Sequence, residues 1–174
     1  MNEPRLRVAV IGLGMASAPH ARSLVDLRDR VEVAAVFSPS LQRREAFAAT
    51  WGFPIRDSME AIFADSSIAA VLLLTPPNTH LELVQKAAAA RKHILLEKPL
   101  DISLERSELL VKTAEASGVK LAVVLQNRFR PTCAPELLHV ETMINADWRM
   151  RRIWAHCECS KARQVMPARR VGDR

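Results

Sequence analysis

Short apolar runs alternate with longer amphipathic stretches over most of this 174-residue chain, and this alternation restricts the fold more than any other feature. The apolar runs fit strands at residues 6–11, 31–37, 53–55, 69–74, 93–96 and 120–124. The stretches between them fit helices at residues 15–26, 41–51, 58–64, 78–91 and 104–117, the last flanked by Ser103 and Gly118 as caps. Strands that alternate with helices form parallel sheets. The sequence therefore predicts an α/β, doubly wound, mostly parallel sheet of about six strands.

The pattern changes after Pro131. Residues 132–174 hold all three cysteines and two of the three tryptophans, and they show no regular period beyond a helical pattern at residues 135–152. A compact domain usually needs about 50 residues or more. We therefore expect one domain over residues 1–131 and an atypical basic tail, helical in part or disordered, over residues 132–174.

The formal net charge of +6 raises the question of nucleic-acid binding. Much of the positive excess lies in the tail, without a recognition motif or an aromatic stacking pattern, so we expect no nucleic-acid partner. A basic tail that contacts an acidic protein is a weaker alternative. The sequence leaves oligomerisation open.

Neither a membrane span nor a secretory signal is expected. No apolar run approaches the roughly 20 residues of a membrane helix, and no cleavage pattern follows the N-terminal apolar run, so we expect a cytoplasmic protein. Cys133, Cys157 and Cys159 are an odd set, which predicts free thiols. The Cys157-Glu158-Cys159 cluster with His156 lacks the paired spacing of a zinc site, so no metal is expected.

The first apolar run leads into Gly12-Leu13-Gly14 and then into a helical stretch. A strand, a tight glycine turn and a helix are the context in which a G-x-G motif binds dinucleotides. Gly12 would permit the turn, and Gly14 would let the backbone approach a pyrophosphate at the helix N-terminus. Ser17, at the third motif position, is small enough for the helix to pack on the strand. The alternative is a tight turn in a domain that binds something else.

The end of the second apolar run bears on which dinucleotide is bound. NAD sites place Asp or Glu there for the ribose hydroxyls, whereas NADP sites use Arg for the 2′-phosphate. This chain has Ser38 there, and Arg43 and Arg44 follow shortly after. The sequence therefore favours NADP, with NAD as the other option. Alternatively, both arginines are solvated helix residues.

Two more motifs follow strands, where a doubly wound domain places its ligand crevice. Thr75-Pro76-Pro77-Asn78-Thr79-His80 follows the fourth apolar run and Glu97-Lys98-Pro99-Leu100 the fifth, and Gln126 to Pro131 reads QNRFRP. With Gly12-Leu13-Gly14, these motifs resemble the glucose-fructose oxidoreductase, inositol dehydrogenase and rhizopine-catabolism (Gfo/Idh/MocA) family. The resemblance covers residues from about 5 to 131.

The resemblance implies that Lys98 is the catalytic residue, which hydrogen-bonds the substrate hydroxyl beside the nicotinamide, with Pro99 commonly cis. It also implies that Glu97 touches the nicotinamide ribose and that the loop from Thr75 forms a wall against the nicotinamide. On local grounds alone, Asn78 caps the next helix, Lys98 is an exposed residue after a strand, and His20 and His93 are structural or exposed. The residues expected at the cofactor are Gly12, Gly14, Met15, Ser38, Arg43, Thr75, Pro76, Asn78, His80, Glu97, Lys98 and Asn127.

The implied activity is NAD(P)-dependent hydride transfer between the nicotinamide and a sugar or cyclitol hydroxyl. Family members continue into a second α/β domain that covers the nicotinamide, and we find no counterpart here. We therefore expect a truncated chain with feeble turnover, and we hypothesise a frame change between Thr132 and Glu136. Family-like sequence in a shifted reading frame of the DNA would support the hypothesis. A non-catalytic NADP-binding module is the alternative function.

Overall fold

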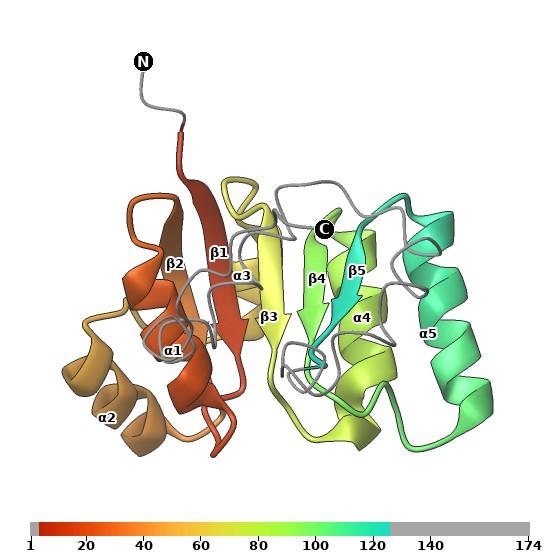
Figure 1. Ribbon diagram of the computed structural model, residues 1–174, viewed down its shortest axis with the longest axis horizontal. Coiled ribbons are helices and arrows are strands. Elements are labelled where there is room, and N and C mark those ends of the chain that lie inside the picture. The colour runs from red at the N-terminus through yellow and green to blue at the C-terminus, as the bar shows by residue number, and fades with distance from the viewer. Residues whose placement is uncertain (1–3, 126–174) are drawn as a thin grey trace, which may run out of the picture. The chain divides into compact units, whose positions relative to one another are not determined.

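Five strands form one sheet whose order is β2-β1-β3-β4-β5 (Figure 1). The computed structural model describes residues 4–125. The strands are β1 (Leu6–Ile11), β2 (Val31–Phe37), β3 (Ala70–Leu73), β4 (His93–Leu96) and β5 (Leu121–Val123). All four neighbouring pairs are parallel. The chain moves outward from β1 to β2 and then from β3 to β5 in the other direction, so the predicted doubly wound α/β class is confirmed.

Helices connect the strands, and serine side chains begin several of them. The helices are α1 (Ser17–Asp26), α2 (Leu41–Trp51), α3 (Met59–Ala64), α4 (His80–Ala89) and α5 (Leu104–Ala116), with a 3₁₀ turn η1 (Pro77–Thr79) before α4. Ser40, Ser58 and Ser103 each accept a backbone N–H in the first turn of α2, α3 and α5. The cap predicted at Ser103 is confirmed, and Gly118 follows α5 with a φ of 66°.

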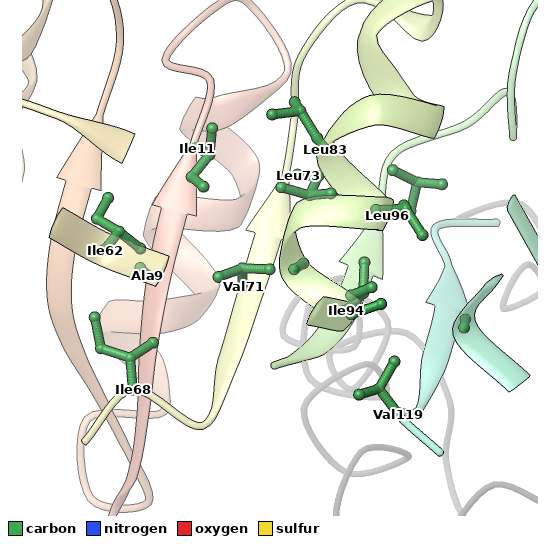
Figure 2. Packing of buried hydrophobic residues seen from close by; sticks show 14 of the residues in the cluster. Ala9, Ile11, Ile62, Ile68, Val71, Leu73, Leu83, Ile94, Leu96 and Val119 are labelled. Atoms are coloured by element: carbon green, nitrogen blue, oxygen red, sulfur yellow. The ribbon is translucent and has the colours of Figure 1, made fainter. Parts of the chain in front are cut away.

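The main core lies between one face of the sheet and the helices packed on it. Figure 2 shows the side chains of β1, β3 and β4 that point to this face, together with residues from α3 and α4. Ala9, Ile11, Val71, Leu73, Ile94 and Leu96 are at most 1 % exposed. Burial of each large apolar side chain contributes about 1.5–3 kcal/mol. The three central strands are therefore firmly packed and give fixed positions to the loops that follow them.

Three expectations about elements are wrong. Residues 53–55 form no strand, because only Ile55 makes a bridge, with Val36, and Pro54 has no N–H to continue a ladder. Helix α1 begins at Ser17 rather than residue 15, so Met15 and Ala16 belong to the loop. Asn78 lies inside η1, and α4 begins at His80 without a side-chain cap. The compact unit that contains the described residues ends at Leu125, so the expected boundary at residue 131 lies outside them.

Candidate functional site

Four loops gather at one edge of the sheet. Since the strands are parallel, the loops that follow β1, β2, β3 and β4 all leave from their carboxyl ends, and Figure 1 shows these ends pointing the same way. The glycine loop, residues 12–16, follows β1, Ser38 follows β2, the Thr75 loop follows β3 and the Lys98 loop follows β4. We call residues 97–100 the Lys98 loop and residues 74–79 the Thr75 loop. Ligands of doubly wound domains bind in the crevice outside this edge.

Gly12 is required by the fold itself. Its φ is 100°, and its N–H donates to Phe37 O at 2.9 Å. A Cβ on Gly12 would lie 2.6 Å from the carbonyl carbon of Leu74 and 2.9 Å from the Thr75 nitrogen. The glycine loop therefore packs directly against the backbone that starts the Thr75 loop.

Gly14 has no such internal reason to be glycine. It is exposed, and a Cβ placed on it would have no atom within 4 Å. Its carbonyl oxygen accepts from the Ser17 N–H at 3.0 Å and from the Ser17 hydroxyl at 2.6 Å. The small buried Ser17 thus holds the loop to the helix, and space is left beside Gly14.

The N-terminus of α1 carries no side-chain cap and no acidic residue in its first turn. Serine side chains cap α2, α3 and α5, whereas α1 and α4 have no side-chain cap, and α4 has Glu82 in its first turn. Uncapped backbone N–H groups and the positive end of the helix dipole favour an anion. The open space at Gly14 and the uncapped helix together fit a phosphate group.

At the end of β2, the two arginines have different surroundings. Arg44 is buried, and its guanidinium donates to Ser38 O at 2.7 Å, lies over the Phe37 ring at 5.6 Å and is 3.5 Å from Asp57. Arg43 is exposed in the first turn of α2. No carboxylate occurs at residues 38–40. Arg44 therefore fixes the loop, and Arg43 has a side chain accessible to a ligand.

Polar contacts inside the Thr75 loop make it rigid. The Thr79 hydroxyl lies 2.8 Å from Pro76 O and 2.9 Å from the Thr75 hydroxyl. Pro76 and Asn78 are exposed at this edge, as is Met15 in the glycine loop, which is 100 % exposed. These exposed residues are accessible to a ligand.

His80 links the Thr75 loop to the Lys98 loop. It is fully buried, with Nε2 2.9 Å from Thr75 O and Nδ1 3.1 Å from Pro99 O and 3.0 Å from Leu100 O. The hydrogen-bonding partners of its ring are backbone oxygens of these two loops, so His80 ties the loops together. Its place at the cofactor stays a prediction.

The Lys98 loop begins with a carboxylate whose two oxygens both have partners. Glu97 Oε2 accepts the Lys98 N–H at 2.7 Å, and Oε1 lies 3.3 Å from His20 Nε2. The Lys98–Pro99 peptide is cis, as the sequence resemblance implied, and the Lys98 side chain is exposed. The loop therefore presents an ammonium group to solvent at the same edge as the glycine loop.

The buried carboxylate of Asp101, the residue after the Lys98 loop, anchors this loop to neighbouring helices. Asp101 accepts from Leu81 N at 3.0 Å, Ile102 N at 2.7 Å and Arg106 Nε at 2.6 Å. Burial works to raise the pKa of Asp101, but these hydrogen bonds, led by that from Arg106, outweigh burial and hold the pKa below its usual range. Arg106 also contacts Glu82 at 3.0 Å, so the network ties the loop to both α4 and α5.

Several expectations concern residues outside the described part of the chain. Asn127 and the whole cysteine cluster lie there. Within residues 4–125, no group of three or more His, Cys, Asp or Glu side chains could hold a metal ion. The same residues include no helix long and apolar enough to cross a membrane.

A family model described as an oxidoreductase family with an NAD-binding Rossmann fold matches residues 6–125. The chain belongs to the Gfo/Idh/MocA oxidoreductase family. Its described domain is accordingly an NAD-binding Rossmann domain, and the glycine loop and the Lys98 loop lie within the matched residues.

Two curated dehydrogenases named for inositol are similar to this chain. The scyllo-inositol 2-dehydrogenase (NAD(+)) of Bacillus subtilis is 35 % identical over 134 residues, which are 76 % of this chain and 39 % of that protein. The inositol 2-dehydrogenase of Mycolicibacterium smegmatis is 34 % identical over 156 residues, 87 % of this chain and 44 % of that protein. The chain thus spans about two fifths of the length of the curated relatives it matches.

A crystal structure of the WlbA dehydrogenase from Bordetella pertussis, in complex with NADH and UDP-GlcNAcA, has the same fold. The TM-score is 0.73 at 27 % identity, and the match covers 80 % of this chain and 42 % of that one. The resemblance to the family that the motifs indicated is therefore confirmed.

The aligned length also bears on the tail. A match over 87 % of 174 residues continues past Pro131 wherever it begins. The frame change between residues 132 and 136 stays a hypothesis.

His20 on α1 is a buried histidine whose ring lies beside the first residue of the Lys98 loop. The sequence predicts a structural or exposed residue, and the buried ring, whose Nε2 lies 3.3 Å from Glu97 Oε1, agrees with the structural role. The signal was present in the sequence: Ser17, His20, Ala21 and Leu24 recur at helical spacing and are all buried. The buried face of α1, near the glycine loop, brings His20 to Glu97 at the carboxyl edge of the sheet.

Proposed function

We propose that the loops at the carboxyl edge bind a nicotinamide dinucleotide, with its pyrophosphate at Gly14 and the N-terminus of α1. The observation that carries this proposal is the space beside Gly14, because nothing inside the domain requires that residue to lack a side chain. The uncapped α1 and the absence of acidic residues in its first turn support the same placement.

We further propose that NADP is preferred over NAD. Ser38 replaces the acidic residue typical of NAD sites, and exposed Arg43 can pair with a 2′-phosphate. Arg44 would act indirectly, because its guanidinium already donates to Ser38 O. Titrations with NADPH and NADH should show tighter NADPH binding, and Arg43→Gln should remove most of the difference. Equal affinities in the unaltered chain would overturn this preference.

The chemistry proposed for the site is oxidation of a hydroxyl-bearing carbon in a sugar or cyclitol to a carbonyl, with loss of a hydride and a proton, or the reverse reduction of the carbonyl. The bound nicotinamide would supply or accept the hydride. The Lys98 ammonium would donate a hydrogen bond to the substrate oxygen and so reduce the cost of negative charge there. Relatives named for inositol, and the WlbA complex with a nucleotide sugar, support this class of substrate.

The remaining residues have two proposed roles: most would contact the dinucleotide, and one would hold the loops in place. We propose that Met15, Thr75, Pro76, Asn78 and Glu97 line the dinucleotide site, with Asn127 as a further candidate outside the described residues. His80 would hold the Thr75 loop and the Lys98 loop together through its ring nitrogens. We place this activity in the cytoplasm, in line with the sequence interpretation.

The test compares the full chain with Lys98→Met. NADPH binding should persist at nearly the same affinity in both, while oxidation of inositol and sugars, followed by nicotinamide absorbance, should be lost in the variant. Strong loss of NADPH binding in Lys98→Met would contradict the assigned role. Binding without turnover on any polyol in the unaltered chain would select the non-catalytic NADP-binding module instead.

A further inference from the structure

His20 and Glu97 form a contact that links α1 to the Lys98 loop. They are 77 residues apart in the chain, and His20 Nε2 lies 3.3 Å from Glu97 Oε1. The two side chains are only 9 % and 13 % exposed. We propose that His20 is a positioning residue: its Nε2–H holds the Glu97 carboxylate, and this carboxylate in turn holds the backbone of Lys98.

The backbone before Lys98 is fixed by the sheet. The Glu97 N–H donates to Leu73 O at 2.9 Å, and Leu96 O accepts the Val124 N–H at 2.8 Å. Lys98 is the next residue, and its N–H donates to a side-chain oxygen, Glu97 Oε2, at 2.7 Å. The path of the chain at Lys98 therefore depends on where the Glu97 carboxylate is held.

The position of His20 is fixed by α1. The buried side chains of this helix include Ser17 and His20, which are three residues apart and so lie on the same face. The Ser17 hydroxyl donates to Gly14 O at 2.6 Å. The same helix thus holds the glycine loop through Ser17 and the Glu97 carboxylate through His20, so the two loops have a common support.

The contact requires one hydrogen, on Nε2 of the His20 ring. An ionised carboxylate can only accept, so Nε2 is the donor. The neutral ring with its hydrogen on Nε2 and the doubly protonated ring both supply this donor, so the inference does not depend on the charge of His20. Without the donor, a largely buried carboxylate oxygen would lose its partner. The Glu97 side chain would then turn toward water and release the Lys98 N–H.

The consequence for the site is that His20 restricts where the Lys98 ammonium group can lie. A fixed backbone at Lys98 narrows the range of positions open to its side chain, which favours a productive geometry toward the substrate oxygen. This consequence for catalysis rests on the proposed function. The hydrogen-bonded connection from His20 through Glu97 to Lys98 does not, and it is tested without a cofactor.

The main experiment measures amide hydrogen exchange by NMR in the full chain and in two variants of His20. His20→Gln keeps a side-chain N–H near the position of Nε2, whereas His20→Leu fills the space without a donor. We expect the Lys98 amide to exchange about tenfold faster or more in His20→Leu, and within about twofold of the unaltered rate in His20→Gln. The amides of β1 should be unchanged in both variants. An unaltered Lys98 rate in His20→Leu, or an equal increase in the two variants, would overturn the proposal.

The His20 ring provides a second measurement that needs no variant to fold. A two-bond ¹H–¹⁵N spectrum of the unaltered chain, with the ring signals assigned through bonds, should show a hydrogen on His20 Nε2. A bare Nε2 would overturn the proposal even if both variants fail to fold. Neither measurement involves a dinucleotide, so their failure is distinct from failure of the proposed function, which the NADPH titration tests.

Discussion

Gly12 and Gly14 are two residues apart, yet they lack side chains for different reasons. A methyl group on Gly12 would lie 2.6 Å from a backbone atom, and the φ of 100° disfavours any side chain there. A methyl group on Gly14 would have no atom within 4 Å. We predict that Gly12→Ala lowers the free energy of unfolding by about 3 kcal/mol or more. Gly14→Ala should leave it nearly unchanged and weaken NADPH binding by about tenfold or more.

Urea unfolding and a fluorescence titration with NADPH, applied to both variants, check this contrast. The two glycines serve as controls for each other, since each change adds one methyl group to the same loop. Unchanged NADPH affinity in Gly14→Ala would contradict the proposed placement of the pyrophosphate beside Gly14.

His93 provides a pH dependence at the scale of one residue. Burial lowers the pKa of His93, and Lys120 lowers it further. The unfolded chain therefore takes up a proton near the usual histidine value of about 6.5 before the folded domain does. Stability is fully present above that pH and declines as the pH falls toward the lower folded value.

Thermal unfolding between about pH 8 and pH 5 measures this effect. We expect the melting temperature of the unaltered chain to fall over this interval more steeply than that of His93→Asn, which keeps an acceptor for Lys120 but does not titrate. Parallel pH curves for the two chains would show that His93 protonates equally in both states.

At the scale of elements, the Asp101 network is what holds the Lys98 loop to α4 and α5. Asp101→Ala would leave two backbone N–H groups and Arg106 Nε without their acceptor, while the other end of the guanidinium keeps Glu82. We predict a loss of about 2–4 kcal/mol in the free energy of unfolding. Glu108→Ala is the matched control, because the exposed pair between Glu108 and Lys112 contributes about 0.5 kcal/mol or less. Equal losses in the two variants, measured by urea unfolding, would contradict the account.

Most elements could be predicted from the sequence because their signals are local. The apolar runs of β1, β2 and β4 lie within their predicted ranges, and Ser103 marks the start of α5 by its own side chain. The 3₁₀ turn at Pro77 and the single bridge at Ile55 could not be predicted from the sequence. Both depend on which backbone groups form hydrogen bonds with other parts of the chain. His80 shows the same limit at the site: its partners Pro99 and Leu100 are 19 and 20 residues away.

At the scale of the whole molecule, the chain spans about two fifths of the curated relatives it matches, so what residues 126–174 contribute bears on activity. The hypothesis of a frame change between residues 132 and 136 makes a prediction about the coding DNA. Translation in a shifted frame from that point should yield sequence similar to inositol dehydrogenases. If similarity continues only in the present frame, the hypothesis is wrong.

The central claim is that the loops at the carboxyl ends of β1, β2, β3 and β4 form one dinucleotide site. The most direct measurement is a ¹H–¹⁵N backbone spectrum of the full chain during titration with NADPH. We predict saturable shifts confined to the glycine loop, the start of α2, the Thr75 loop and the Lys98 loop, with Gly14 among the amides that move most. Shifts concentrated at the opposite edge of the sheet, around Arg30 and Lys92, or no saturable shift at all, would contradict the account.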